Sequence, residues 1–589
     1  MSGRVEAYVR LLQEPLSMPK PSDSSAAPTS FDSSGAPTSS AASDGTASLT
    51  VRRVLASRPY VEIGGPSLAV RDDRSGLVAV AGGGSGLQWP GRDAPGNRSG
   101  YRIGVYGPDG RCHHRVRTRW AVQAMAVHPV LPLLAIGTGG WYHEGELLIL
   151  DLESGAVAAM FDGARSVPGL RWLDARSLEV RLATDDEESA ADPDFTDLRE
   201  VLERDDWTQV GDGEVPVADL PYGPPEFVPL DPPASSAGEL TRLRAEIDAA
   251  GPVRGAVWAV EALPDGALLA TRHGTNVECW DPDGTLRWTV PGGDGGRELL
   301  LAPDGESVWV NLTTRKVWGF SGWEDLPYPA DRIAVRDGAV LETLDPGFPY
   351  VATMRTDGWL ALRDCRVWVD EPTETVLVAP DREGRSGAAS RVAARVQVGE
   401  YSLFAHHFPV RRAPELLFLQ GEGEQGTLRK RVVAVDPPAV EGAAATVRRL
   451  FALEWDDARD GSLSGGPAVY VEDERGGGLV HAGTVFEAQG RSVDSAFVVR
   501  RALPDGEPAW VFCADAAPAA MDIDAEGGTV YVAFDSGEIV ALDARDGSVR
   551  ARGGLRIDGY LADPLSLAVV GPGRIAVGMV DGRIAECSF

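Results

Sequence analysis

Short apolar runs alternate with turn-forming residues along most of this chain, and the clearest example lies at residues 519–553. There AAMDID, TVYVAF, EIVALD and SVRARG follow one another, joined by AEGG, DSG and ARDG. Short runs rich in Val, Ile and Tyr, separated by turns of Asp and Gly, are typical of β-hairpins. This stretch is therefore predicted to form four antiparallel strands.

The same arrangement recurs upstream and indicates an all-β fold built from repeated units. A sheet of four strands cannot bury both faces alone, so repeated sheets stack on one another, as the blades of a β-propeller do. Nine or ten candidate units are more than the usual four to eight blades. Insertions, two joined propellers and one unusually large ring all stay open. The units cover 67–118, 122–161 and 257–290, weaker ones begin near Gly169, Glu298, Arg332, Tyr401 and Ala468, and the last ends at Phe589.

The last unit has only three strand-like runs, SLAVVGPG, RIAVGMV and RIAECSF. A further run, SLTVRRVLAS, stands alone before the first complete unit. An amino-terminal strand that completes the last blade would remove an exposed sheet edge. We therefore predict that Leu49–Leu55 pairs with Arg583–Ser588 and closes the propeller.

Two parts of the chain are predicted to lie outside the repeats. Residues 1–48 combine a short helix over Met1–Glu14 with a linker rich in Ser, Ala and Pro, which has too few apolar residues to offset the entropy of ordering. The helix is either a frayed tail or a tethered docking peptide. The rest, 49–589, is predicted to be the propeller domain, with an insert at about 185–251.

The insert is predicted to contain two helices. Asp192–Trp207 places apolar residues on one helical face and acidic residues on the other. Ser235–Gly251 begins with a capping-box pattern, Ser236 to Glu239, and carries Leu240, Leu243 and Ile247 along one side. The pair is expected to pack on the rim of the propeller, to recruit a basic partner, or both.

Several repeats resemble known propeller families. YVAFDSGEIVALDARDGSVRA and YVATMRTDGWLALRDCRVWV resemble the repeat of quinoprotein-like, PQQ-type propellers, and CWDPDGTLRW is similar to the Trp-Asp strand end of WD40 repeats. The resemblance implies a propeller fold from about residue 50. It departs from the WD40 pattern in lacking the Gly-His pair, and from quinoprotein dehydrogenases in lacking the adjacent cysteine pair and the secretory leader.

Charge and cysteine usage narrow the classes of function. The net charge of −31 repels phosphate backbones, so nucleic acid is not expected as a ligand. Five scattered cysteines without CxxC spacing, and a first segment without an apolar h-region, predict a cytoplasmic protein with reduced thiols and no membrane segment. With only three lysines, arginine supplies nearly all the positive charge, a composition that resembles proteins of actinobacterial type.

The sequence names no reaction. It contains no G-x-S-x-G, Walker A or H-E-x-x-H motif, and we expect no cofactor and no metal. The tandem histidines His113–His114 and His406–His407 would point to opposite faces of a strand and so are not expected to share a metal. DIDAEG at Asp522 resembles a calcium loop, but its distal glutamate position is Ala533, so we interpret it as a turn.

Enlarged loops supply the candidate binding residues. The loop between the second and third strands is minimal in the clearest units, but the first three units have long ones, predicted to lie on the same face. Exposed Trp, Tyr and Arg side chains are typical binding anchors, although these could also fold back onto the blades. The candidate partner-binding residues are Trp89 and Arg92 in the first loop and Trp141, Tyr142, His143 and Glu144 in the second.

Two functions fit these features. The first is a non-catalytic protein-interaction scaffold or sensor subunit that binds protein partners through the enlarged loops. The alternative is an enzyme or small-ligand binder that uses the central channel, for which His143, Glu144 and Asp185 are the only cluster to nominate. Because function inferred from fold is only an analogy, the choice between these two functions depends on the residues of the site.

Overall fold

A computed structural model describes the chain in segments, which together carry most of the predicted strands. Within the described residues, no helix has both the length and the apolar composition that a membrane span requires. The described residues are 48–83, 101–140, 144–162, 165–183, 198–215, 234–250, 255–272, 277–292, 298–319, 322–365, 374–380, 392–399, 410–422, 428–440, 442–453, 462–486, 495–514 and 516–589.

The described residues fall into two compact units, of which one is inserted into the other along the chain. Residues 57–253 form one unit, which we call the inserted unit. Residues 44–56 and 254–589 form the other, which we call the ring unit. The expected repeats are thus divided between two units, while the domain boundaries predicted from the sequence stay predictions because residues 1–47 lie outside the described part.

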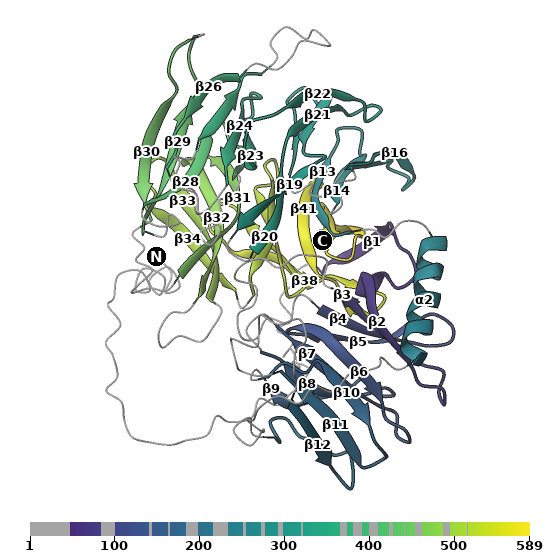
Figure 1. Ribbon diagram of the computed structural model, residues 1–589. Coiled ribbons are helices and arrows are strands. Elements are labelled where there is room, and N and C mark those ends of the chain that lie inside the picture. The colour runs from purple at the N-terminus through teal and green to yellow at the C-terminus, as the bar shows by residue number, and fades with distance from the viewer. Residues whose placement is uncertain are drawn as a thin grey trace, which may run out of the picture. The chain divides into compact units, whose positions relative to one another are not determined.

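The ring unit contains seven sheets of three to five strands in its described part, most of them four-stranded and antiparallel (Figure 1). The first sheet consists of β13 (Val257–Ala262), β14 (Leu268–Arg272), β15 (Val277–Trp280) and β16 (Leu286–Val290); the second of β17 (Leu299–Leu301), β18 (Ser307–Val310), β21 (Ala330–Ala334) and β22 (Val340–Leu344); and the third of β23 (Tyr350–Met354), β24 (Leu360–Asp364), β25 (Thr375–Val378) and β26 (Val392–Val396). The fourth sheet consists of β28 (Leu416–Glu422), β29 (Leu428–Asp436) and β30 (Thr446–Ala452), and the fifth of β27 (Val410–Arg411) with β31 (Ser462–Asp473), β32 (Gly476–Phe486), β33 (Ser495–Ala502) and β34 (Pro508–Ala514). The sixth sheet consists of β35 (Pro518–Asp524), β36 (Thr529–Phe534), β37 (Glu538–Asp543) and β38 (Val549–Gly554), and the seventh of β41 (Pro564–Gly571), β42 (Arg574–Met579) and β43 (Ile584–Ser588) with β1 (Thr50–Leu55). Two hairpins, β19 (Thr314–Gly319) with β20 (Gly322–Pro327) and β39 (Arg556–Ile557) with β40 (Tyr560–Leu561), complete it.

Shared apolar cores join these seven sheets into a closed cycle. Each sheet contributes buried residues to one cluster with the preceding sheet and to another with the following sheet, and the seventh sheet shares a cluster with the first. Successive clusters hold Leu269 with Val310, Trp309 with Leu362, Leu377 with Phe418, Val432 with Val499, Val498 with Val532, Ala541 with Val577, and Ala568 with Val260. The all-β propeller fold predicted from the repeats is therefore confirmed.

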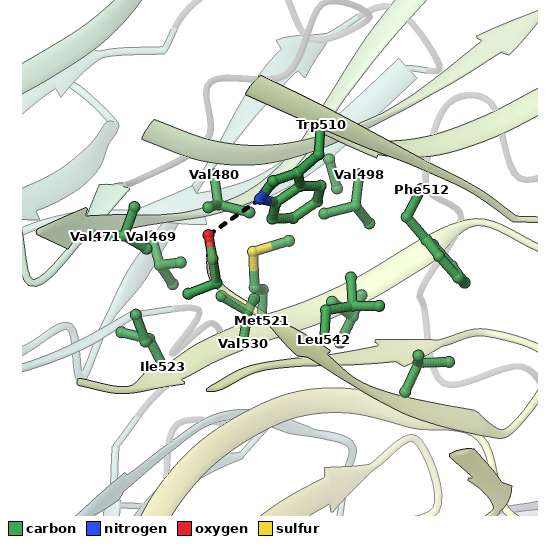
Figure 2. Close-up of a cluster of buried hydrophobic side chains, with 14 of the residues drawn as sticks. Val469, Val471, Val480, Val498, Trp510, Phe512, Met521, Ile523, Val530 and Leu542 are labelled. Carbon is green, nitrogen blue, oxygen red and sulfur yellow. Dashed lines mark hydrogen bonds between the residues drawn. The ribbon is translucent and has the colours of Figure 1, made fainter. Parts of the chain in front are cut away.

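The core between the fifth and sixth sheets shows how turn chemistry supports this packing (Figure 2). Trp510 is 3% exposed, and its indole Nε1 donates a hydrogen bond of 3.0 Å to the backbone oxygen of Ala544, drawn as a dashed line in Figure 2. The turn that follows Ala544 brings Gly547 against the same ring with a φ of +72°, and a Cβ there would lie 2.7 Å from the indole. Only glycine satisfies both constraints at this position.

The predicted closure is also confirmed. β1 pairs antiparallel with β43, from Thr50 opposite Ser588 to Leu55 opposite Ile584. Arg53 adds a side-chain link to Glu586, by an ion pair and hydrogen bond. β1, the first strand in the described part of the chain, thus supplies the fourth strand of the last sheet.

The inserted unit contains three sheets that stack in a row in its described part. They are β2 (Gly65–Arg71), β3 (Val78–Gly83), β4 (Tyr101–Tyr106) and β5 (Cys112–Thr118); β6 (Ala121–Val127), β7 (Leu133–Gly139), β8 (Glu146–Asp151) and β9 (Val157–Asp162); and β10 (Gly169–Trp172), β11 (Ser177–Leu182) and β12 (Leu198–Glu203). One apolar cluster joins the first sheet to the second, and another joins the second to the third.

A helix covers the free face of the first sheet in this row. α2 (Ala234–Ala249) packs along β2 (Figure 1), and its Leu243 and Ile247 are buried with residues of β3 and of the short helix η1 (Val61–Ile63). The helix predicted over Ser235–Gly251 is thus present. Glu239, expected to cap its start, instead lies buried and accepts hydrogen bonds of 3.1 and 2.7 Å from Arg71.

The other helix predicted in the insert is wrong. Residues from Leu198 to Glu203 form strand β12, which pairs with β11 along its full length. The spacing of Leu198, Val201 and Leu202 fits one face of a helix, but the edge of β11 offers backbone partners to the same residues, and Leu202 packs into the core between the second and third sheets. Tertiary pairing therefore outweighs the helical periodicity here.

Loss of the closing strand is expected to destabilise the ring unit. A variant that begins at Ala56 would leave the β43 edge unpaired and expose the apolar side chains that β1 covers, of which Leu55 is 5% exposed. We expect a loss of about 3 kcal/mol or more, since each buried aliphatic side chain contributes about 1.5–3 kcal/mol. The measurement is thermal unfolding by circular dichroism.

Rescue in trans separates lost pairing from general damage. A synthetic peptide of residues 48–57 is expected to raise the melting temperature of the truncated protein in a dose-dependent way. A scrambled peptide of the same composition is the control. An unchanged melting temperature after truncation would contradict the closing role of β1.

Candidate functional site

The three sheets of the inserted unit are aligned so that corresponding turns lie at the same end. Arg74 Nη2, in the β2–β3 turn, donates to the backbone oxygens of His128 (3.1 Å) and Leu131 (2.6 Å) in the β6–β7 turn. The His128 ring Nε2 lies 3.0 Å from the backbone oxygen of Ala175 in the β10–β11 turn. Because β3, β7 and β11 each begin at one of these turns, their carboxyl ends all lie at the end of the row that is opposite to the turns.

That opposite end, which we call the loop end, is where the three enlarged connections begin. The first leaves β3 at Gly83, the second leaves β7 at Gly139, and the third leaves β11 at Leu182. The expectation that the three loops share a face agrees with these attachment points. Of the predicted binding residues, Trp89, Arg92, Trp141, Tyr142 and His143 lie outside the described residues, as does Asp185, and only Glu144 is described.

Glu144 lies beside an aromatic residue that the sequence analysis did not single out. Its carboxylate Oε2 accepts a hydrogen bond of 3.2 Å from the indole Nε1 of Trp120, in the short connection between β5 and β6. The guanidinium of Arg119 lies 5.0 Å from the centre of the Trp120 ring, within cation–π range. A half-buried tryptophan between an arginine and a glutamate is thus present at the base of the second loop.

Buried charges hold the bases of these loops. Glu146, at the start of β8, is fully buried, and its carboxylate lies 3.4 Å from the backbone nitrogen of Arg119. Arg165 is 1% exposed and donates from Nε (3.0 Å) and Nη2 (2.6 Å) to the backbone oxygen of Ala183, where the third connection begins. Buried charged side chains with backbone partners therefore lie where the second and third connections begin.

The tandem histidines in the described part, His113 and His114, have separate polar partners. His113 lies 3.8 Å from a carboxylate oxygen of Asp109, whereas the His114 ring Nε2 lies 2.9 Å from the backbone oxygen of Glu153. Their separate partners fit neighbours on β5 that point to opposite faces. No group of three or more metal-ligating side chains occurs among the described residues, and His406–His407 lie outside them.

The ring unit contains a second concentration of charge, on strands at its inner wall. The first strands of the fifth, sixth, seventh and first sheets, β31, β35, β41 and β13, lie next to one another in that order. The two-residue strand β27 pairs with β31 in parallel, which places Arg411 and Arg412 among these strands. Four side chains from three distant parts of the sequence meet there, and we call them the central cluster: Glu261, Arg411, Arg412 and Asp522.

The two arginines of the central cluster together bridge the first, sixth and seventh sheets. Arg411 Nη2 binds Glu261 Oε2 at 2.5 Å, and its Nη1 donates to the backbone oxygen of Leu567 at 3.3 Å. Arg412 binds both carboxylate oxygens of Asp522 at 2.9 Å, and Asp522 Oδ2 also accepts from the backbone nitrogen of Val569 at 2.9 Å. The cluster thus joins β13, β27, β35 and β41.

The two carboxylates of the central cluster differ in protonation behaviour. Burial alone would raise the pKa of Asp522, whose side chain is fully buried, but Arg411 and Arg412 together hold it below its ordinary value. Burial raises the pKa of Glu261, and the attraction of Arg411 offsets this only in part. Asp522 is therefore the firmly ionised partner.

Arg412 adopts a backbone conformation that is uncommon for its type. Its φ of 60° lies in the left-handed region, which costs about 1–2 kcal/mol for a residue with a Cβ. The bidentate pair with Asp522 fixes this conformation. The sequence signal for the cluster is a carboxylate within a predicted strand, Glu261 in VWAVEA and Asp522 in AAMDID, although the overlapping stretch DIDAEG is interpreted as a turn.

Comparisons with known proteins add only fold-level similarity. No family model and no curated protein matches the chain. Among solved structures it is similar to the C-terminal WD40 domain of Sif2 (13% identity, 57% of this chain and 96% of that chain, TM-score 0.36), to the Myceliophteria thermophila Cps50 (Swd1) β-propeller domain (11%, 57% and 97%, 0.36), and to Kuenenia stuttgartiensis hydrazine synthase (13%, 57% and 97%, 0.39). At these values the neighbours carry no argument about function.

The chain is a β-propeller repeat protein. Its own sheets and cores establish that class, and its binding surfaces must be argued from its own residues.

Removing the charge of Asp522 is expected to destabilise the ring unit more than removing that of Glu261. Asp522→Asn leaves Arg411 and Arg412 short of a buried counter-charge, at a cost of about 3 kcal/mol, whereas Glu261→Gln keeps a hydrogen-bond acceptor for Arg411 and costs about 1 kcal/mol or less. Thermal unfolding at neutral pH tests this order. Equal melting temperatures for the two variants would contradict it.

The ion pairs of Asp522 with the two arginines also predict that the stability of the ring unit depends on pH. Because the folded-state pKa of Asp522 is lowered, its stabilisation is fully present above the ordinary aspartate pKa of about 4 and is lost as the pH falls further. The stability gap between the wild type and Asp522→Asn should therefore close on acidification.

Proposed function

We propose that this protein is a non-catalytic protein-interaction scaffold or sensor subunit, and that it captures a partner protein through the loop end of the inserted unit. The observation that carries the proposal is that three enlarged connections leave their strands at the same end of the row of sheets, the end at which Trp120 lies. Partner identity is left to experiment, and a cytoplasmic location stays a prediction.

The chemistry of the loop end supports binding rather than catalysis. Trp120 combines a large apolar surface with an indole donor, a residue type enriched in energetic hot spots of interfaces. Arg119 and Glu144 flank it with opposite charges, which is typical of a polar rim around an aromatic anchor. Trp89, Arg92, Trp141, Tyr142 and His143 remain the predicted tips of this surface.

The alternative, an enzyme or ligand binder that uses the central channel, has less support. The two arginines and two carboxylates of the central cluster neutralise one another, and each arginine lies within ion-pair distance of both carboxylates, which suits a structural tie. Glu144, which we had nominated for the channel, belongs to the inserted unit and accepts the Trp120 indole hydrogen bond.

Replacing the aromatic residues of the loop end is expected to abolish partner capture without unfolding the protein. Trp120→Ala, and separately the Trp89→Ala and Trp141→Ala double variant, should each reduce capture of the partner at least about tenfold, since a hot-spot residue contributes about 2 kcal/mol or more. The measurement is affinity capture of the full chain from its native lysate with quantitative mass spectrometry.

A matched control removes exposed apolar surface elsewhere. Val340 and Leu341 on β22 are 50% and 47% exposed, so Val340→Ser with Leu341→Ser should leave capture unchanged. Melting temperatures of all variants are compared in parallel. Capture that survives the tryptophan substitutions, or that falls equally in the control, would refute the assignment of the loop end.

A further inference from the structure

A cavity of about 490 Å³ lies in the inserted unit, between the outer strands of its second and third sheets. Its floor is apolar and consists of Met160 on β9, Leu202 on β12 and Val215. Met160 is only 2% exposed, so the cavity reaches the core. We call it the acidic cavity because four carboxylates line it: Glu203, Asp205, Asp206 and Glu214.

The positive charges at the acidic cavity are already engaged. Arg204 pairs with Glu214 at 2.5 Å and donates to the backbone oxygen of Gln209 at 2.8 Å. Arg176, just outside, pairs with Asp205. Two arginines therefore face four carboxylates, so the net charge of these six side chains is negative.

Two of these carboxylates, Asp206 and Glu214, have pKa values lowered by hydrogen bonds and stay ionised at neutral pH. Hydrogen bonds from the Thr208 hydroxyl and backbone nitrogen lower the pKa of Asp206. Hydrogen bonds from Arg204 and from the backbone of Gly211 lower the pKa of Glu214. The cavity thus combines an apolar floor with a rim of fixed negative charge.

In the part of the chain that the structure describes, the third sheet has one strand fewer than the two before it, and its last strand, β12, lies beside the cavity. The first two sheets of the inserted unit have four strands, whereas the third consists of β10, β11 and β12. Within the described residues, β12 pairs with β11 on one side and with no strand on the other. An edge of this kind offers backbone donors and acceptors to one more extended segment.

We propose that the acidic cavity and the β12 edge together bind an extended, basic segment of a partner protein. The segment adds to the third sheet as a fourth strand, and a lysine or arginine side chain enters the cavity. The aliphatic stem of such a side chain covers Met160 and Leu202, while its cationic end meets the carboxylate rim. This inference rests on the proposed scaffold function but names a second site and the chemistry of its occupant.

The two sites lie at opposite ends of the third sheet. Glu203 at the cavity pairs with Ser177, the first residue of β11, next to the β10–β11 turn, whereas the loop end lies beyond Leu182, the last residue of β11. Failure at one site can therefore be distinguished from failure at the other.

The test uses fluorescence anisotropy with full-length protein and a labelled peptide of about ten alternating valine and lysine residues, the length of a long strand. Saturable binding is expected, and Glu203→Lys with Asp205→Lys should weaken it at least about tenfold because both rim charges are reversed. Trp120→Ala, at the loop end, should leave it unchanged.

Two controls make the result specific. Asp73→Lys with Glu153→Lys reverses two exposed carboxylates elsewhere in the inserted unit and should change binding less than about twofold. The same peptide with alternate backbone nitrogens methylated keeps its charge but cannot pair with a strand edge, and its binding should be lost. The proposal would be overturned if the peptide does not bind, if both charge-reversal pairs weaken binding equally, or if the methylated peptide binds fully. It would also be overturned if sedimentation shows that a second copy of the chain occupies the edge.

Discussion

The antiparallel ladder between β1 and β43 is the interaction on which the ring unit depends. Apart from β27, which joins β31 from beyond the fourth sheet, the other sheets of the ring are formed by strands close in sequence, but the seventh takes its fourth strand from the beginning of the described chain. Without it, the last sheet would present an open edge, and the cores it shares with its two neighbours would lose part of their cover. Closure of the cycle thus converts seven locally folded sheets into one cooperative unit.

The central cluster adds positional control that apolar packing does not supply. Aliphatic side chains tolerate small shifts between sheets, whereas the two-point contact of Arg412 with Asp522 is satisfied in one arrangement only. Arg411 extends the same constraint to Glu261 on the first sheet. These pairs act across the junction where the ring closes, which is where a register error between sheets would do the most damage.

Much of the fold was predictable because it is written in local patterns. Two-residue alternation with Asp and Gly turns marks the strands, and the unpaired run at residues 48–57 marks the closure. The strand β12 was not predictable because LREVLE satisfies both a helical and an extended pattern, and only the edge of β11 decides between them. The central cluster was hidden for a related reason: Arg412 and Asp522 are 110 positions apart, and Arg411 and Glu261 are 150 positions apart. Trp120 was overlooked because it sits in a short connection, although that connection lies at the same end as the enlarged loops.

The position of the inserted unit also sets the order in which the protein assembles during synthesis. Arg53 and its partner Glu586 are 533 positions apart, with all of residues 57–253 between β1 and the first complete sheet of the ring. At roughly 5–20 residues per second, β1 leaves the ribosome about 30–100 s before β43 exists. The inserted unit has time to fold during this interval, while β1, with the sequence TVRRVL, has no partner strand. Nascent chains of this protein are therefore expected to be clients of cellular chaperones until translation reaches the last strand.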